Sequence, residues 1–175
     1  MDCAVVPGMN REERLNQWIE TYSDAILRTC FLYLSDQAQA EDALQDTWIK
    51  AWKHMSEYEN QGIQNEKAWL MRIAINTCKD YRRTAWFRHI DNRKALEELP
   101  DRLLRTEAED RSLSLMIMDL PNRYKQVVLL YYFQGFTQAE TAAVLGISPS
   151  SVLRRLRNAE ALLKQSLTGG EEHER

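Results

Sequence analysis

The sequence predicts an all-α protein made of two small helical domains joined by a flexible linker. Its 175 residues include only 6 Gly and 4 Pro, and 44% of them are hydrophobic, which is enough to fill helical cores. Apolar residues recur at three- and four-residue spacings in several segments. Between residues 86 and 111 this pattern stops in a charged stretch that contains Pro100. The length allows two small domains, and we place their boundary in this stretch.

Three amphipathic helices are expected in the amino-terminal half. The first covers about residues 12–34. Asp36 is a suitable N-cap for the second helix, whose apolar stripe consists of Ala43, Leu44, Thr47, Trp48, Ala51, Trp52 and Met55. Residues 56–64 lack a helical period and predict a loop. The third helix covers about residues 65–86, and we expect the core of this bundle to include Trp48, Trp52 and Trp69.

A second helical group follows the charged stretch. One helix ends before Pro121 and carries Leu113, Met116, Ile117 and Leu120. Pro121 suits the start of the next helix, which ends near Gly135. We therefore assign four segments along the chain: a first domain over residues 10–87, a linker over 88–111, a second domain over 112–168 and an acidic tail over 169–175.

The carboxyl-terminal third carries the signals of two helices joined by a tight turn. Thr137 and Glu140 fit a capping box at the start of a short helix, and Gly146 can adopt the left-handed conformation that ends it. Ser148 and Pro149 then supply an N-cap and a first helical residue. This pattern predicts a DNA-binding helix-turn-helix. The candidate DNA-binding residues on its last helix are Ser150, Ser151, Arg154, Arg155, Arg157 and Asn158.

A second candidate DNA-binding surface lies on the helix expected over residues 65–86. Four polar residues spaced by four, three and four positions fall within about 60° of arc, namely Arg72, Asn76, Lys79 and Arg83. Such a ribbon suits a phosphate backbone and base edges, although an ordinary solvated helix face has the same pattern. The preceding loop offers an aromatic ring and amides to an unstacked base, through Tyr58, Asn60, Gln61 and Asn65.

The net charge of −3 argues against a protein that coats DNA on its own. The charge is unevenly distributed, however. Residues 67–94 contain eight basic and two acidic residues, and residues 112–167 contain six basic and three acidic residues. The stretch between them, residues 95–111, contains six acidic and three basic residues. This pattern predicts two locally basic surfaces separated by an acidic linker.

Several other classes of protein have no support in the sequence. The longest apolar run, residues 127–133, is too short to span a bilayer, and residues 1–9 do not form a secretory signal. The cysteines have no CxxC spacing, so we expect a reduced, cytoplasmic protein without disulfides, with Cys78 as a small core residue. No metal-ligand spacing joins the three histidines, His54, His89 and His173. We expect no cofactor, no metal and no enzymatic activity.

These segments resemble bacterial sigma factors of the sigma-70 family. Residues 121–163, which begin PNRY, are similar to region 4. The sequence EDALQDTW at residues 41–48, followed by Trp52, resembles region 2.2, and residues 68–83, which begin AWLMRIAIN, resemble region 2.4. The order of the regions, the short linker and the absence of a region 3 are similar to the extracytoplasmic-function (ECF) group. The resemblance covers about residues 11–167, nearly the whole chain.

The resemblance implies a transcription initiation factor that binds core RNA polymerase and directs it to specific promoters. The third helix and the loop before it would recognise and help melt the −10 element, and the last helix would read the −35 element. Region 4 would also meet the flap region of the polymerase. The second helix would bind the clamp helices of the largest polymerase subunit, through Asp42, Gln45, Asp46, Lys50 and Lys53.

Sigma factors of this group are usually held inactive by an anti-sigma factor, which is often anchored in the membrane. We therefore expect such a partner, while no part of this chain is expected to insert into a membrane. A stand-alone helix-turn-helix regulator is the alternative function. In that case the amino-terminal bundle would dimerise or bind a ligand, and the dimer would bind a palindrome.

Overall fold

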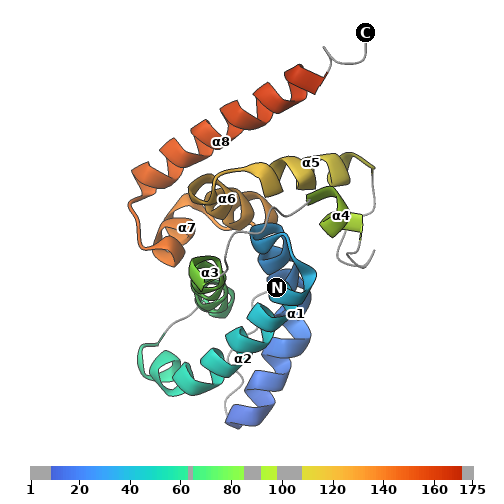
Figure 1. Cartoon of the computed structure of the whole chain (residues 1–175). Helices are drawn as coiled ribbons and strands as arrows, with labels where there is room; N and C mark the ends of the chain where they lie inside the picture. Colours follow the sequence, from blue (N-terminus) through green and yellow to red (C-terminus); the bar gives the residue numbers. More distant parts are fainter. Residues whose placement is uncertain (1–8, 63–64, 85–91, 98–107, 171–175) are drawn as a thin grey trace.

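The computed structural model describes residues 9–62, 65–84, 92–97 and 108–170, and every regular element in these ranges is helical. The predicted all-α class is confirmed. Helices α1 to α3 form one bundle, α5 to α8 form a second group beside it, and α8 projects away from the body (Figure 1). The elements in chain order are α1 (Arg11–Leu34), α2 (Gln37–Asn60), α3 (Glu66–Thr84), α4 (Asn92–Glu97), α5 (Ala108–Asp119), α6 (Asn122–Val128), the π-helical turn η2 (Leu129–Phe133), α7 (Gln138–Leu145) and α8 (Pro149–Gly170).

Side-chain caps close the starts of α1 and α2. Asn10 Oδ1 accepts a hydrogen bond from the Glu13 N–H at 2.9 Å, and the Glu13 carboxylate accepts one from the Asn10 N–H at 3.0 Å. Ser35, in a left-handed conformation with φ 58°, ends α1. Asp36 then accepts a hydrogen bond from the Gln39 N–H at 2.8 Å and starts α2. The predicted cap at Asp36 is confirmed, and the capping box at Asn10 is an additional feature.

Helix α2 continues to Asn60, so the prediction of a loop over residues 56–64 is wrong for residues 56–60. Met55 and Tyr58 extend the buried stripe of the helix by another turn, with 0% and 3% of their surface exposed. The Tyr58 ring packs on Trp18 of α1 and Trp69 of α3, with centroid distances of 5.3 Å and 4.8 Å. This aromatic cluster joins the three helices of the bundle at one end.

The carboxyl-terminal helices follow the predicted helix-turn-helix signals. Thr137 and Glu140 form the capping box of α7, and Gly146 ends that helix with φ 66°. Ser148 Oγ accepts a hydrogen bond from the Ser151 N–H at 3.2 Å at the start of α8. These local predictions are confirmed. The helices α6, α7 and α8 share a small core of four buried residues, Val127, Ala142, Val152 and Leu156.

Part of the expected linker is folded into helices. Residues 92–97 form α4, whose Leu96 is 4% exposed and belongs to the main hydrophobic core. Asn92 Nδ2 donates a hydrogen bond to the Asp119 carboxylate at the end of α5. Helix α5 already begins at Ala108, within the segment assigned to the linker. Helical structure therefore extends further into this stretch than its charge predicts, while residues 98–107 lie outside the described residues.

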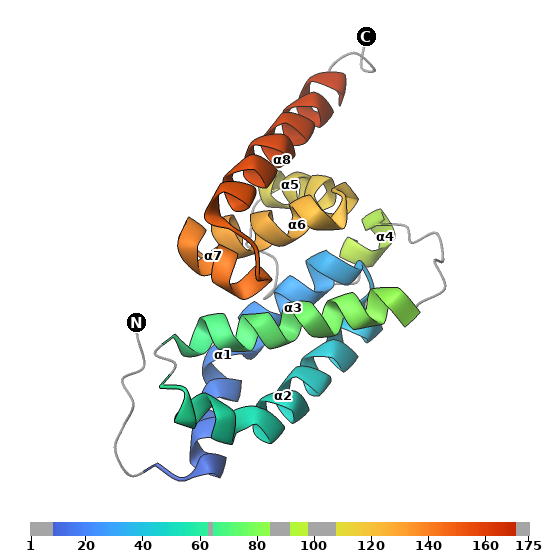
Figure 2. The same cartoon turned by 90° about the vertical axis from the view of Figure 1, so that its left-hand side faces the viewer.

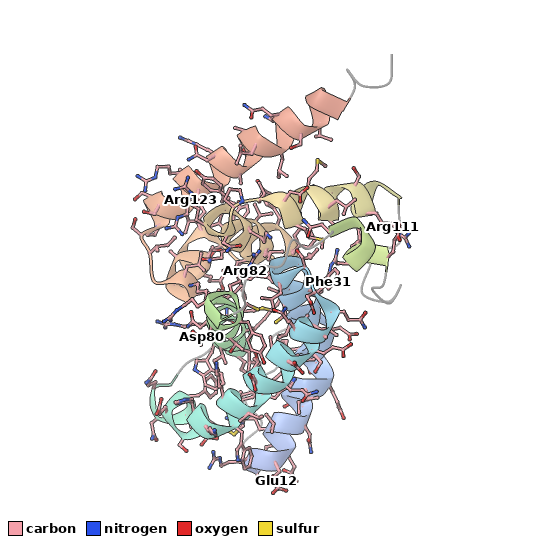
Figure 3. The ribbon with its side chains drawn as sticks, in the orientation of Figure 1. Glu12, Phe31, Asp80, Arg82, Arg111 and Arg123 are labelled. Carbon is pink, nitrogen blue, oxygen red and sulfur yellow. The ribbon has the colours of Figure 1, made fainter. Side chains whose placement is uncertain are left out.

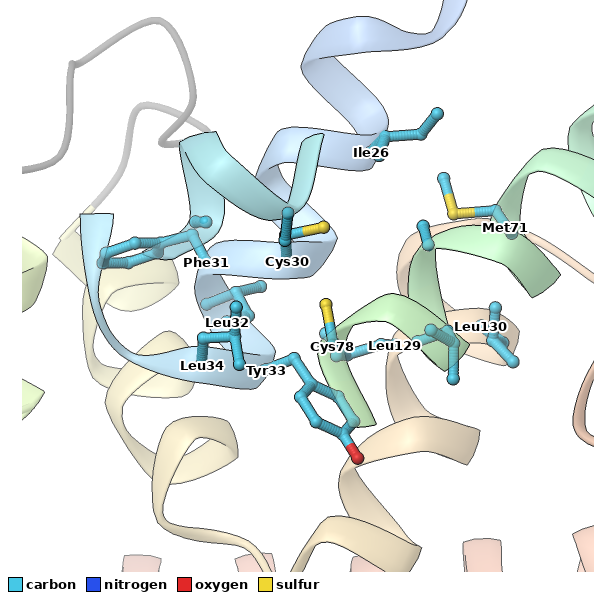
Figure 4. Packing of buried hydrophobic residues seen from close by; sticks show 14 of the residues in the cluster. Ile26, Cys30, Phe31, Leu32, Tyr33, Leu34, Met71, Cys78, Leu129 and Leu130 are labelled. Atoms are coloured by element: carbon cyan, nitrogen blue, oxygen red, sulfur yellow. The ribbon is translucent and has the colours of Figure 1, made fainter. Parts of the chain in front are cut away.

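One hydrophobic core runs through both groups of helices. Leu129 and Leu130 of η2 are both 0% exposed and belong to the same cluster as Met71 and Cys78 of α3 (Figure 4). In the π-helical turn, Gln134 N donates a hydrogen bond to Leu129 O at 3.0 Å, and both leucines are buried. As a result α3 lies between α2 on one side and α7 on the other (Figure 2).

Lys125 of α6 is a fully buried lysine, with 0% of its surface exposed. Its Nζ donates a hydrogen bond to the Met118 carbonyl oxygen at 2.7 Å. The pKa of Lys125 is lowered to about 8, mainly by burial and in addition by the positive charge of Arg82, while Asp119 opposes the shift. Arg82 lies where α3 approaches the carboxyl-terminal helices (Figure 3). The charged form of Lys125 therefore destabilises the folded state.

We expect the free energy of unfolding to rise between about pH 8 and about pH 10. In this range the unfolded chain still binds the Lys125 proton, because its pKa is near 10.5, whereas the folded chain has lost it. The substitution Lys125→Met should raise the free energy of unfolding at neutral pH by about 3 kcal/mol and remove most of the rise. Urea unfolding of both proteins across this pH range measures the effect.

A smaller rise should remain in the variant, because burial also lowers the pKa of Lys67 and of Lys79. A Lys125→Met protein that matches the wild type in both its stability at neutral pH and its pH dependence would contradict this account of the buried ammonium.

Candidate nucleic-acid interface

The amino-terminal turns of α8 present the residues predicted to bind DNA. Of the six, only Ser151 and Arg155 are half-buried, and the other four are exposed. On the opposite side of the helix Val152 and Leu156 are 0% and 3% exposed and attach it to α6 and α7. A helix held along one side in this way can place its other side in a major groove.

Three serines cluster at the start of α8. The Ser148 hydroxyl lies 3.0 Å from that of Ser150 and donates a hydrogen bond to that of Ser151 at 2.9 Å. These hydroxyls lie at the positive end of the helix, where unpaired backbone N–H groups favour a phosphate oxygen. Further along α8, Asn158 Nδ2 lies 3.5 Å from the Tyr124 hydroxyl of α6. Asn158 therefore also contacts the helix that orients α8.

The polar ribbon predicted on α3 is present. Arg72, Asn76 and Arg83 are exposed, and Lys79 is half-buried. Burial lowers the pKa of Lys79, and the positive charge of Arg155 on α8 lowers it further. The two candidate DNA-binding surfaces therefore approach each other where Lys79 lies near Arg155.

Tyr58 is not available to stack on a base, contrary to the prediction from the sequence. Its ring is buried in the aromatic cluster with Trp18 and Trp69, and burial raises the pKa of its hydroxyl to about 12. The same periodicity that extends α2 could have identified it as a core residue. Asn60 and Gln61 are exposed in the segment that follows.

Asn65 has two structural tasks at the start of α3. Its Oδ1 accepts a hydrogen bond from the Ala68 N–H at 2.9 Å, which caps α3. Its Nδ2 donates a hydrogen bond to Glu140 Oε1 of α7, also at 2.9 Å. The candidate −10 loop and the helix-turn-helix are thus in direct contact.

The candidate polymerase surface on α2 divides into two parts. Asp46 accepts a hydrogen bond from the Tyr81 hydroxyl at 2.9 Å, and Lys50 Nζ donates one to Thr77 Oγ1 at 3.0 Å. These two residues therefore link α2 to α3. The remaining three candidates are exposed to solvent, namely Asp42, Gln45 and Lys53.

Two apolar residues add to this surface of α2. Trp52 is 36% exposed, so the prediction that it belongs to the core is wrong, whereas Trp48 and Trp69 pack against the core as expected. The Arg11 guanidinium lies 4.7 Å from the Trp52 ring centroid. Ile49 is 51% exposed. The sequence could have identified it, because it is an apolar residue that lies outside the buried stripe of α2. Exposed apolar residues among charged ones are typical of a protein-binding surface.

Within the described ranges, no group of three or more His, Cys, Asp or Glu side chains could hold a metal ion. None of the helices described there combines the length and apolar character needed to cross a membrane. Cys78 is buried, as predicted, and its hydrogen bond with Cys30, followed by burial, raises the pKa of its thiol. Cys3 lies outside the described residues.

Comparison with known protein families gives two matches. Residues 18–88 match the model of Sigma-70 region 2, and residues 110–163 match that of Sigma-70, region 4. The ECF RNA polymerase sigma factor SigL of Mycobacterium tuberculosis is 29% identical over 152 residues, which are 85% of each chain. The RNA polymerase sigma-E factor of Streptomyces antibioticus is 30% identical, covering 85% of this chain and 82% of the relative. SigZ, an RNA polymerase sigma factor of Bacillus subtilis, is 31% identical, covering 78% of this chain and 77% of SigZ.

Two solved structures are similar over most of the chain. CnrH, solved in complex with the cytosolic domain of CnrY, has a TM-score of 0.68 at 25% identity and covers 91% of this chain and 90% of its own. The sigma factor RpoE of Bartonella quintana, solved in complex with the anti-sigma factor NepR, has the same fold, with a TM-score of 0.70 at 20% identity. The match covers 89% of this chain and 98% of RpoE.

Proposed function

The chain belongs to the ECF group of sigma-70 RNA polymerase sigma factors and is a transcription initiation factor, and we propose which of its surfaces bind the promoter and the polymerase. One observation carries the proposal: two basic helix faces, on α3 and α8, lie in the segments that match region 2 and region 4. We assign residues 10–87 to region 2, 88–111 to the linker, 112–168 to region 4 and 169–175 to a tail.

The −35 element is read by the start of α8. Arg154 and Arg157 are exposed and can reach base edges or phosphates in the major groove. Ser150 and Ser151 lie at the positive end of the helix and suit a phosphate. Arg155 is half-buried within electrostatic range of Lys79, and we assign it to the same DNA-binding side of α8.

The −10 element is bound by α3 and the segment before it. Arg72, Asn76, Lys79 and Arg83 form a ribbon that follows a phosphate backbone, and the amides of Asn60 and Asn65 suit the edges of unstacked bases. Tyr58 supports this segment by packing on Trp18 and Trp69 in the aromatic cluster. Its role is to position the loop.

Core RNA polymerase docks on the outer side of α2. Asp42, Gln45 and Lys53 surround the exposed apolar pair Ile49 and Trp52, a combination suited to the clamp helices of the largest subunit. Asp46 and Lys50 act at the edge of this surface, where they also hold α2 against α3. Region 4 faces the flap region of the polymerase.

An anti-sigma factor is the second protein partner that we propose. In the two similar structures, CnrH is bound to the cytosolic domain of CnrY, and the sigma factor RpoE is bound to the anti-sigma factor NepR. A partner of this kind, anchored in the membrane or not, would act on this chain in the cytoplasm, where polymerase and DNA are found. The chain itself supplies binding and positioning, and the polymerase supplies the chemistry. A stand-alone regulator is not favoured, because the amino-terminal half matches region 2.

Charge reversal on α8 tests the assignment of the −35 reader. The double variant Arg154→Glu and Arg155→Glu should lose at least about 30-fold of its promoter-dependent transcription, because each base or phosphate contact contributes about 1–3 kcal/mol. Affinity for core polymerase should change little, since its main docking surface lies on α2 and we assign these two arginines to DNA and not to the flap contact. Lys164→Glu, on an exposed site further along the same helix, is the matched control and should behave as the wild type. Loss of polymerase binding together with transcription would contradict the assignment.

Charge reversal on α2 tests the polymerase surface in the same way. Asp42→Lys combined with Lys53→Glu leaves the net charge unchanged and should weaken the affinity for core polymerase by at least about tenfold, because both charges face the partner. Fluorescence anisotropy of labelled protein titrated with core polymerase measures this affinity. Glu20→Lys, on the exposed side of α1, serves as the control. Equal affinities for the double variant and the control would show that polymerase binds elsewhere.

A further inference from the structure

Arg11, in the first turn of α1, makes two contacts with a single residue of α2. Its Nη2 donates a hydrogen bond to the Trp52 carbonyl oxygen at 2.9 Å. Its guanidinium also lies over the Trp52 ring, 4.7 Å from the ring centroid. A planar guanidinium can make both contacts at once, because it carries several N–H donors and stacks on aromatic faces. The side chain of Arg11 is therefore held on Trp52, although both residues are exposed.

The first turn of α1 is itself well anchored, so Arg11 extends from a fixed point. The capping box of Asn10 and Glu13 closes this turn. One turn further along α1, Arg14 Nη1 lies 3.5 Å from Glu59 Oε1 in the last turns of α2. The start of α1 thus lies beside the second half of α2 (Figure 2).

Trp52 belongs to the side of α2 that we assign to the polymerase. Asp42, Gln45, Ile49 and Trp52 follow one another at spacings of three, four and three residues, so they lie along one side of the helix. Trp52 is the largest side chain in this row and is 36% exposed. Tryptophan is among the residues that contribute most to the binding energy of protein interfaces. Arg11 therefore holds the side chain from which we expect the strongest polymerase contact.

The position of an exposed tryptophan matters for affinity, because a partner that binds one rotamer must first exclude the others. Arg11 restricts this freedom before binding. Its guanidinium covers one face of the Trp52 ring and is tied to the backbone of the same residue. Ordering one such side chain in advance improves an affinity by about 2- to 10-fold.

We propose that Arg11 is a positioning residue of the polymerase-binding surface, which fixes the Trp52 side chain in the orientation that core RNA polymerase binds. This inference rests on the proposed function of α2. It gives the first turn of α1 a role in polymerase binding, although that turn precedes residues 18–88, which match region 2. Because Arg11 acts through Trp52, its removal weakens polymerase binding only while the Trp52 side chain is present.

A double-mutant cycle on polymerase affinity tests the proposal. Fluorescence anisotropy with core RNA polymerase from the organism that encodes the chain is recorded for Arg11→Ala, Trp52→Ala and the protein that carries both. Trp52→Ala should weaken binding by at least about tenfold and Arg11→Ala by about 2- to 10-fold. Adding Arg11→Ala to Trp52→Ala should cause no further loss. Glu12→Ala, which truncates an exposed residue of the same turn (Figure 3), is the matched control and should bind as the wild type.

Fluorine NMR separates this role from a purely structural one. The protein is labelled with 5-fluorotryptophan, and the Trp52 resonance is assigned by its absence from Trp52→Leu. In Arg11→Ala this resonance should move toward its position in the urea-unfolded chain, because the charge over the ring and the restriction of the side chain are lost. The resonance of the buried Trp18 should stay in place.

Arg11→Lys is the conservative variant. It keeps the charge, but an ammonium group cannot stack on the ring and donate to the carbonyl oxygen as a guanidinium does. Its affinity and its Trp52 resonance should lie between those of the wild type and of Arg11→Ala. Far-UV circular dichroism verifies the fold of each variant, and Trp52→Leu takes the place of Trp52→Ala in the cycle if the alanine variant unfolds.

An equal loss of affinity from Arg11→Ala with and without the Trp52 side chain would show that Arg11 contacts the polymerase directly, and would overturn the proposal. So would wild-type affinity in Arg11→Ala, or a Trp52 resonance that Arg11→Ala leaves in place. If Trp52→Ala itself binds as tightly as the wild type, polymerase docking on this part of α2 fails and the inference fails with it. That result is distinct from a failure confined to Arg11.

Discussion

The packing of η2 against α1 and α3 is the constraint on which the rest of this structure depends. Leu129 and Leu130 continue the core of the amino-terminal bundle, and Gln134 pairs with buried polar groups of α1. Because these contacts fix α6 and α7, and those helices carry α8 through Val152 and Leu156, they also determine where the reading helix points. Two elements that we assign to separate parts of a promoter are therefore held in one body.

Local features were predictable from the sequence because each depends on neighbouring residues. Each of these features is predicted by residues no more than four positions away from it, as at the caps Asp36, Thr137 and Ser148 and the turn at Gly146. Contacts such as Gln134 with Thr29, which are 105 residues apart, have no such signal. The burial of Tyr58 and the exposure of Trp52 were misjudged for a related reason, since an aromatic residue at the edge of a stripe is placed by its tertiary neighbours.

The charge pattern is consistent with a protein that acts through a partner. A net charge of −3 limits the attraction of the whole chain to DNA, yet α3 and the start of α8 each expose arginines on one side. The acidic residues are concentrated elsewhere, including residues 95–111. From this division we expect weak binding of the unbound protein to DNA and stronger binding within the polymerase complex, where the polymerase contributes part of the phosphate attraction.

The most direct test of this account is run-off transcription on fragmented genomic DNA with core RNA polymerase from the same organism, with and without this protein, under heparin challenge. The account predicts discrete transcripts that require both components, whose mapped start sites share two sequence elements upstream. Absence of such transcripts, together with specific binding of the protein alone to a palindromic site, would contradict it and identify a stand-alone regulator.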